Sequence, residues 1–100
     1  MEPLSRLTAA TADVLDALLH GHGAIWGLRI VSATGRPSGS VYPILERLER
    51  AGWVDSEWED DAARPGPRRR LYALTADGRV AAADAVRRVA QASAGREALA

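Results

Sequence analysis

The sequence predicts a mainly α-helical fold with a two-stranded β-hairpin between its third and fourth helices. Apolar residues recur at helical spacing in three segments before residue 52 and in one segment after residue 75. Between them, two short strand-like segments surround a Pro-Gly-Pro sequence, which is typical of a hairpin turn. A chain of 100 residues has the size of one domain, so residues 1–100 are expected to fold as a single domain.

The pattern at the N-terminus predicts two helices in succession. The first begins at Leu4 or Thr8 and ends at His20, because the glycines that follow it open a turn. The second covers about 24–33, and a Thr-Gly-Arg-Pro sequence at 34–37 is a turn signal that ends it.

A third helix is predicted from Ser38 or Ser40 to Ala51, and Gly52 occupies the position where glycine commonly ends a helix. Proline costs little in the first turn of a helix but about 3 kcal/mol in its interior. We therefore expect Pro43 to lie near the start of the regular helix, so that this helix begins near Ser40 and the two preceding residues form a turn.

Two strands follow, at about 53–58 and 71–74, and the connection at 60–70 is expected to be exposed. Thr75 is the expected cap of a last helix at about 76–92. Three helices, two strands and a helix form the element order of a winged helix-turn-helix domain with one added helix. We accordingly expect the winged helix-turn-helix at residues 4–74 and a C-terminal dimerisation helix at residues 75–93.

The last helix carries a thin stripe of small residues, which permits close approach of another helix. A chain this short buries only about 60–65% of its unfolded surface, so help from a second subunit is expected. The first and last helices are the candidate dimer interface, although the last helix could also only cover its own subunit. The residues expected at the interface are Leu4, Leu7, Val80, Ala83, Val86, Val89 and Ala90.

Charge is separated along the chain, although the formal net charge is zero. Five acids and no base occur in Asp55–Asp61, and four arginines and no acid occur in Arg64–Arg70. All thirteen basic residues are arginines, whose guanidinium groups can bind phosphate or guanine through two parallel hydrogen bonds. The net charge of zero argues against non-specific binding to nucleic acid, so any contact with DNA must come from a local group of basic residues. The alternative is that the arginine run only pairs with the acids beside it.

The third helix and the hairpin tip carry the residue types that contact DNA. The N-terminal end of a helix offers unpaired N–H groups to phosphate, while Glu46 and Glu49 would repel it, so this helix should enter DNA by its tip. The tip prolines donate no N–H, and the arginines around them are expected to project outward. The alternative is that Ser38 and Ser40 only cap the helix and Tyr42 is only a surface aromatic. The residues expected to contact DNA are Arg36, Ser38, Gly39, Ser40, Tyr42, Pro43, Arg47, Arg64, Arg68, Arg69 and Arg70.

The segment 38–54, with its Tyr-Pro pair, resembles the recognition-helix signature of the PadR family of transcriptional regulators. The segment 67–79, which contains Tyr-x-Leu-Thr-x-x-Gly, resembles that family's wing and its entry into the last helix. The resemblance extends over about residues 11–90. The chain departs from the family pattern at Gly-Leu-Arg-Ile in 27–30, because the family usually carries an acid where this chain has Arg29. The resemblance implies a bacterial dimeric repressor of the short subfamily without a separate C-terminal domain.

These observations predict a dimeric, sequence-specific DNA-binding regulator, a repressor that a small molecule or another signal relieves. Its partner would be a roughly palindromic operator with half-sites about 34 Å apart. A winged-helix module that binds protein and no DNA is the alternative. Trp26 is a candidate effector contact, because the resemblance to the PadR family implies that a short member can bind planar drugs between its subunits. The alternative is that Trp26 only packs in the core.

Other classes of site are not supported by the residue pattern. No histidine and acid accompany a serine in a catalytic arrangement, and His20 and His22 lack further metal ligands. We therefore expect no enzyme, no catalytic residue, no metal site and no cofactor. With no cysteine, no apolar run near the roughly 18 residues of a membrane span and no signal peptide, the expected location is the cytoplasm. The resemblance to the PadR family implies that this is a bacterial cytoplasm, where the protein would lie on the nucleoid when bound to DNA.

Overall fold

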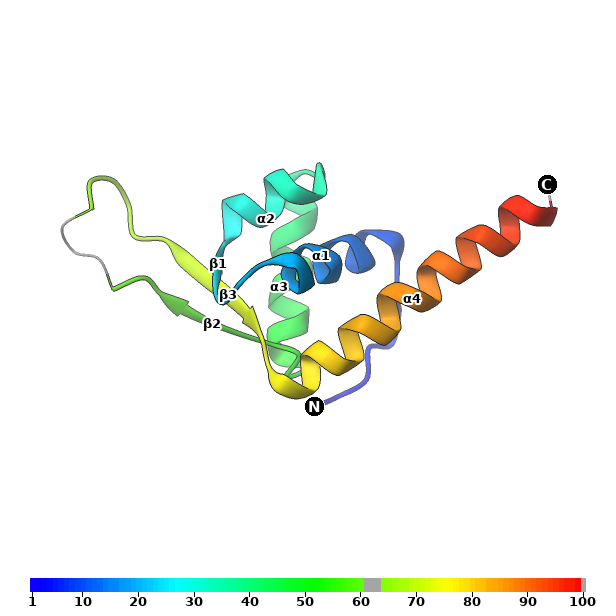
Figure 1. Ribbon diagram of the computed structural model, residues 1–100. Helices are drawn as coiled ribbons and strands as arrows, with labels where there is room; N and C mark the ends of the chain where they lie inside the picture. Colours follow the sequence, from blue (N-terminus) through cyan, green and yellow to red (C-terminus); the bar gives the residue numbers. More distant parts are fainter. Residues whose placement is uncertain (61–63, 100) are drawn as a thin grey trace.

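The computed structural model describes residues 1–60 and 64–99, and it confirms a helix-rich fold with a β-wing. Figure 1 shows a helical body from which the hairpin projects on one side and the last helix on the other. The elements in chain order are α1 (Ala9–His20), β1 (Ile25–Trp26), α2 (Gly27–Thr34), α3 (Ser38–Arg50), β2 (Val54–Trp58), β3 (Arg70–Leu74) and α4 (Ala76–Leu99).

The two predicted strands of the wing are present as β2 and β3, but the sheet has a third antiparallel strand that was not predicted, in the order β1-β3-β2. Ile25 pairs with Tyr72 and Trp26 with Leu71, on the edge of β3 opposite to β2. Residues 24–33 were expected to form one helix, whereas Ile25 and Trp26 are extended and α2 begins only at Gly27. A β-branched residue followed by an aromatic residue suits a strand, but two residues are too few for alternation to reveal one.

Helix α3 begins at Ser38, not near Ser40 as expected. The carbonyl of Pro37 accepts hydrogen bonds from Ser40 N at 3.0 Å and Val41 N at 3.1 Å, so the first turn already closes around Ser38. Pro43 is therefore inside the helix, where it has no N–H to donate to the carbonyl of Gly39. The helix tolerates this loss at an end where both residues are exposed to water.

Helix α4 continues to Leu99, beyond the expected end near residue 92. Its N-terminus has the expected cap, because the hydroxyl of Thr75 accepts a hydrogen bond from Gly78 N at 2.9 Å. The buried Ala82 and Ala85 join the hydrophobic core, and α4 packs along α1. The later turns of α4 extend away from the body (Figure 1).

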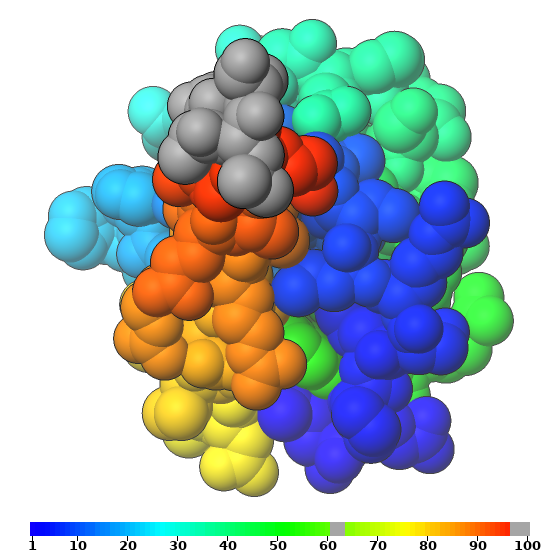
Figure 2. Space-filling model, turned by 90° about the vertical axis from the view of Figure 1, so that its right-hand side faces the viewer, coloured from blue at the N-terminus to red at the C-terminus, as the bar shows by residue number. Residues whose placement is uncertain are grey.

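The core lies between the helices and the inner face of the sheet. Its most deeply buried side chains are Val14, Leu15, Leu18, Ile30, Val41, Leu45, Leu48 and Val54. Trp53 is also buried, and its indole N–H donates to the carbonyl of Glu2 at 2.6 Å. This hydrogen bond holds the N-terminal segment against the rest of the domain, where it lies next to α4 (Figure 2).

Candidate nucleic-acid interface

The outer face of α3 is polar and exposed, while its inner face is apolar and buried. Val41, Ile44, Leu45 and Leu48 face the core. The exposed residues of the helix are Ser38, Gly39, Ser40, Pro43, Glu46, Arg47, Glu49 and Arg50. Within the described part of the chain no side chain caps the N-terminus of α3, so Ser38 and Ser40 are not capping residues. The exposed helix tip therefore combines free serine hydroxyls with the positive end of the helix dipole.

Tyr42 lies at the border between the exposed and the buried face of α3. Its ring is half-buried, belongs to the rim of the core and packs against Gly27 of α2. A Cβ atom at Gly27 would come within 2.8 Å of the phenol oxygen of Tyr42. The glycine at the start of α2 thus makes room for this ring, and it was the signal in the sequence that could have placed Tyr42 between two helices.

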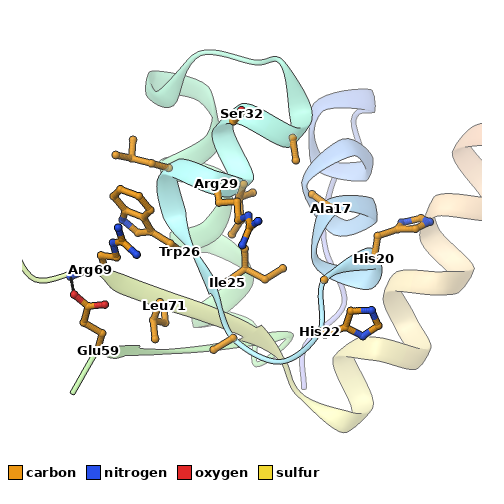
Figure 3. A pocket seen from close by; sticks show the side chains of 15 residues that line it. Ala17, His20, His22, Ile25, Trp26, Arg29, Ser32, Glu59, Arg69 and Leu71 are labelled. Carbon is orange, nitrogen blue, oxygen red and sulfur yellow. Dashed lines mark hydrogen bonds between the residues drawn. The ribbon is translucent and has the colours of Figure 1, made fainter. Parts of the chain in front are cut away.

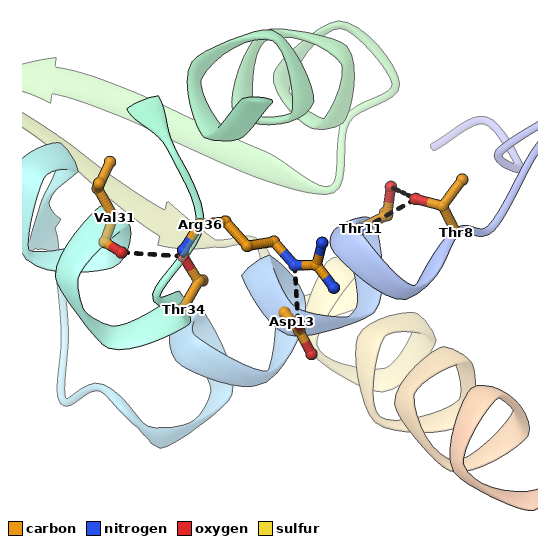
Figure 4. Close-up of polar contacts among 6 residues, drawn as sticks. All are labelled: Thr8, Thr11, Asp13, Val31, Thr34 and Arg36. Carbon is orange, nitrogen blue, oxygen red and sulfur yellow. Dashed lines mark hydrogen bonds and ion pairs between the residues drawn. The ribbon is translucent and has the colours of Figure 1, made fainter. Parts of the chain in front are cut away.

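Arg36 is engaged within its own subunit. Its Nε donates to the carboxylate of Asp13 at 2.8 Å, which ties the turn between α2 and α3 to α1 (Figure 4). The same turn is closed by Thr34, whose hydroxyl donates to the carbonyl of Val31 at 2.9 Å and accepts from Arg36 N at 3.2 Å. Any contact of Arg36 with DNA would compete with this ion pair.

The three consecutive arginines of the wing point to two different faces of the sheet. The guanidinium of Arg69 lies 4.0 Å from the ring of Trp26, whereas those of Arg68 and Arg70 lie 5.9 Å and 5.1 Å from the ring of Trp58. Successive residues of a strand point to opposite sides, which explains this division. The expectation that all the wing arginines project outward is wrong for Arg69, whose Nε is buried.

Arg64 is also turned inward, contrary to the same expectation. Its Nε donates to Glu59 at 2.6 Å, and its terminal nitrogens bind the carbonyls of Pro65 and Pro67. The hydrogen bond from Arg64 is the main cause that lowers the pKa of Glu59 below its usual range. Arg64 therefore closes its own loop around Glu59. Asp61, the last acid of the predicted acidic run, lies outside the described residues.

Arg70 is connected to α3 through two polar side chains. Its Nη2 donates to the hydroxyl of Ser56 at 2.7 Å, and this hydroxyl in turn donates to the carboxylate of Glu49 at 2.6 Å. In the register of the hairpin, Ser56 pairs with Tyr72 and Trp58 with Arg70, so these residues share the face of the sheet that packs on α3. Glu49 was expected to repel phosphate. In the structure its carboxylate is connected through the hydroxyl of Ser56 to the guanidinium group of Arg70, so a positive charge lies near its negative charge.

The structure thus brings part of the predicted DNA-contact set to one side of the molecule. We define the α3–wing face as the exposed residues of the α3 tip together with Arg47, Arg68, Arg70 and Trp58. Trp58 is half exposed, at 52%, and lies outside the hydrophobic core. Its position opposite Arg70, on the same face of the strand pair, was a signal that period-two alternation could have given.

The other side of the sheet borders a wide groove of about 960 Å³, between the end of α1, β1, α2 and β3 (Figure 3). Its apolar lining includes Ile25, Leu28, Ile30, Leu71 and Trp26. Its charged and titratable lining consists of His20, His22, Arg29, Arg69 and Glu59. Glu59 already pairs with Arg64, while the Nε of Arg69 has no hydrogen-bond partner among the described residues. The groove therefore combines apolar walls with an excess of basic groups.

The residues expected at a dimer interface fall into two groups. Val80, which is 75% exposed, Ala83 and Ala90 point into solvent, while Val86 and Val89 are half-buried. Leu4 and Leu7 are half-buried, and both pack against the core of their own subunit. The predicted interface residues that are exposed to solvent therefore all lie on α4.

The sequence profile of the transcriptional regulator PadR-like family matches residues 19–84 of the chain. The match begins at the end of α1 and contains α2, α3, the whole sheet and the first turns of α4. The chain belongs to the PadR-like family of transcriptional regulators. The resemblance noted for the recognition helix and the wing is thus confirmed.

Solved structures of other regulators share the fold. A PadR family transcriptional regulator from Eggerthella lenta is 23% identical with a TM-score of 0.65, over 86% of this chain and 79% of that one. BpsR of Bordetella bronchiseptica, whose DNA binding is regulated by 6-hydroxynicotinic acid, is 30% identical with a TM-score of 0.73. PcaV of Streptomyces coelicolor, solved with its natural ligand, is 21% identical with a TM-score of 0.78.

The matches cover 91% and 96% of this chain but only 61% of BpsR and 64% of PcaV, so the chain spans less than two thirds of either regulator. No curated protein sequence matches the chain. Among the helices of the described residues, none is both long enough and apolar enough to cross a membrane.

Proposed function

We propose that the protein is a dimeric repressor that binds a roughly palindromic operator through its α3–wing face. The observation that carries this proposal is that α3 and the guanidinium groups of Arg68 and Arg70 lie on the same face of the sheet. The helix tip would enter the major groove, with Ser38, Gly39 and Ser40 nearest to the bases and phosphates. Arg47 and the two wing arginines would bind the flanking backbone.

The remaining candidate residues are assigned indirect roles in this proposal. Arg36 and Tyr42 hold the helix-turn-helix together through Asp13 and Gly27, and Pro43 lies on the exposed helix surface beside the tip. Arg64 and Arg69 shape the hairpin from within. An operator-bound regulator of this kind would act in the bacterial cytoplasm, on the nucleoid.

The dimer is supported by the surface of α4. Its buried residues, Ala82 and Ala85, are small, and the exposed Val80 and Ala83 leave an apolar strip on the opposite side. A second copy of the helix could pack closely on this strip. A twofold axis there would present two α3 tips to successive major grooves, about 34 Å apart.

The wild-type protein is expected to protect two half-sites, about one helical turn apart, in the DNA upstream of its own gene. The affinity should fall steeply with salt, because each neutralised phosphate adds about 0.9 to the slope of log K against log salt concentration. Footprinting and fluorescence anisotropy at several salt concentrations measure both quantities. Binding of an acidic protein partner without any binding to DNA would instead favour the protein-interaction module.

We further propose that a small organic anion relieves repression by binding in the groove beside Trp26. The groove supplies apolar walls, an aromatic ring and the guanidinium group of Arg69, whose Nε has no hydrogen-bond partner within residues 1–60 and 64–99. Arg69 lies between Arg68 and Arg70 in the chain, directly before β3, so a ligand that draws Arg69 away from Trp26 would shift the wing. The regulation of BpsR by 6-hydroxynicotinic acid shows that such an anion can control a regulator of this fold.

A planar aromatic carboxylate such as 6-hydroxynicotinic acid is expected to quench tryptophan fluorescence and to release the operator. Arg69→Ala should retain operator binding but lose the release, because the guanidinium that pairs with the carboxylate is gone. Isothermal titration of both proteins, with and without operator DNA, measures the effect. Equal release from the wild type and from Arg69→Ala would contradict the assignment of this groove.

A further inference from the structure

Trp58 is an unusually exposed aromatic residue at the end of β2. Just over half of its surface, 52%, is open to solvent, and it is not part of the hydrophobic core or its rim. The groups that lie over its ring are the guanidinium groups of Arg68 and Arg70, at 5.9 Å and 5.1 Å from the ring centre. A large apolar side chain is thus kept at the surface in contact with two cations.

The guanidinium group of each arginine also donates a hydrogen bond, which restricts its position further. Arg70 donates to Ser56, which is bound to Glu49 of α3, while Arg68 donates to the carbonyl of Glu59 at 3.3 Å. Cation–π contacts with tryptophan are favourable even at exposed sites. The two guanidinium groups are therefore held on the α3 side of the hairpin before any partner arrives.

We propose that Trp58 is a positioning residue for DNA binding, which holds Arg68 and Arg70 ready to bind the DNA backbone on the α3 side of the hairpin. This inference rests on the proposed function of the α3–wing face. Ordering a long side chain on binding weakens affinity by roughly two- to tenfold, so an arginine that is already ordered binds more tightly. Trp58 acts through the arginines and makes no DNA contact of its own.

Loss of the ring is expected to weaken operator binding by roughly tenfold in Trp58→Ala, with the salt slope unchanged because both cations remain. Trp58→Phe keeps an aromatic face and should restore most of the affinity. Fluorescence anisotropy with the upstream DNA, measured across a salt series, gives both values. Thermal unfolding of each variant verifies that the compared proteins are folded. Wild-type affinity in Trp58→Ala, or an equal loss in Trp58→Phe, would overturn the proposal.

A double-mutant cycle provides a sharper test. In an Arg68→Ala/Arg70→Ala background, the further change Trp58→Ala should have no effect on affinity, because the groups that it positions are absent. A full additional loss would overturn the positioning role, since it would mean that Trp58 contacts DNA directly. Failure of the wild type to bind DNA at all would instead refute the proposed function, so the two failures are distinguishable.

Discussion

The Arg68→Ala/Arg70→Ala variant is expected to lower the salt slope of operator binding by about 1.8, because each lost phosphate contact removes about 0.9 from it. The affinity at low salt should fall by one to two orders of magnitude, on the order of 1–3 kcal/mol, as for loss of two charge-assisted hydrogen bonds. Both side chains lie on the α3 side of the hairpin, where DNA would pass. Anisotropy titrations at several salt concentrations measure the slope and the affinity together.

Arg69 offers a matched control for this prediction. Arg69→Ala removes the same charge as Arg70→Ala from the neighbouring position, but its side chain lies on Trp26 at the opposite face. The single Arg70→Ala change should therefore lower the slope by about 0.9, while Arg69→Ala leaves it unchanged. Equal slopes for the two single variants would mean that the wing does not approach DNA by the α3 side.

Gly78→Ala is expected to destabilise the domain severely. A Cβ at this position would lie 2.0 Å from the carbonyl oxygen of Trp53 and 2.8 Å from the hydroxyl of Thr75. The first is a backbone atom between the end of α3 and β2, so relief requires α4 to move away from the body. We expect a loss of about 3 kcal/mol or more, which for a chain of this size lowers Tm by more than 10 °C.

Gly95 is the control in the same helix. A Cβ at Gly95 meets no atom within 4 Å, so Gly95→Ala should be neutral or should stabilise the helix by up to about 1 kcal/mol. Differential scanning calorimetry of both variants measures the contrast. A Gly78→Ala protein with the wild-type Tm would show that α4 does not rest on the backbone of Trp53. Glycine is thus needed at the last position of the Tyr-x-Leu-Thr-x-x-Gly sequence because a side chain there would collide with the backbone of Trp53.

The helices and the hairpin could be predicted from the sequence because their patterns are long enough to repeat. The apolar spacing of α1 and α3 and the two strands of the wing all appear near their expected positions. Strand β1 has only two residues, and it pairs with β3 across a long stretch of chain: Trp26 lies 45 residues before its partner Leu71, and Ile25 lies 47 residues before Tyr72. The end of α4 was missed because residues after 92 lose the apolar stripe while alanine and arginine still favour a helix.

The candidate site was predictable in its location but not in the directions of its side chains. The run Arg68–Arg70 was recognised as a basic wing, yet the contacts that separate Arg69 from its neighbours depend on Trp26 and Trp58, which come from other strands. The inward turn of Arg64 depends on Glu59, and the place of Tyr42 depends on Gly27. Each of these directions follows from a tertiary contact, which a local pattern does not contain.

The division of three neighbouring arginines between two faces has a thermodynamic consequence. The three consecutive residues that lead into β3 carry both the side chains that would bind DNA and the side chain that borders the groove. If an occupant of the groove reduces the affinity for the operator by some factor, the operator must reduce the affinity for that occupant by the same factor. The free protein would then be the better receptor for the signal, so the cellular concentration of operator sites would itself set the threshold at which the signal is sensed.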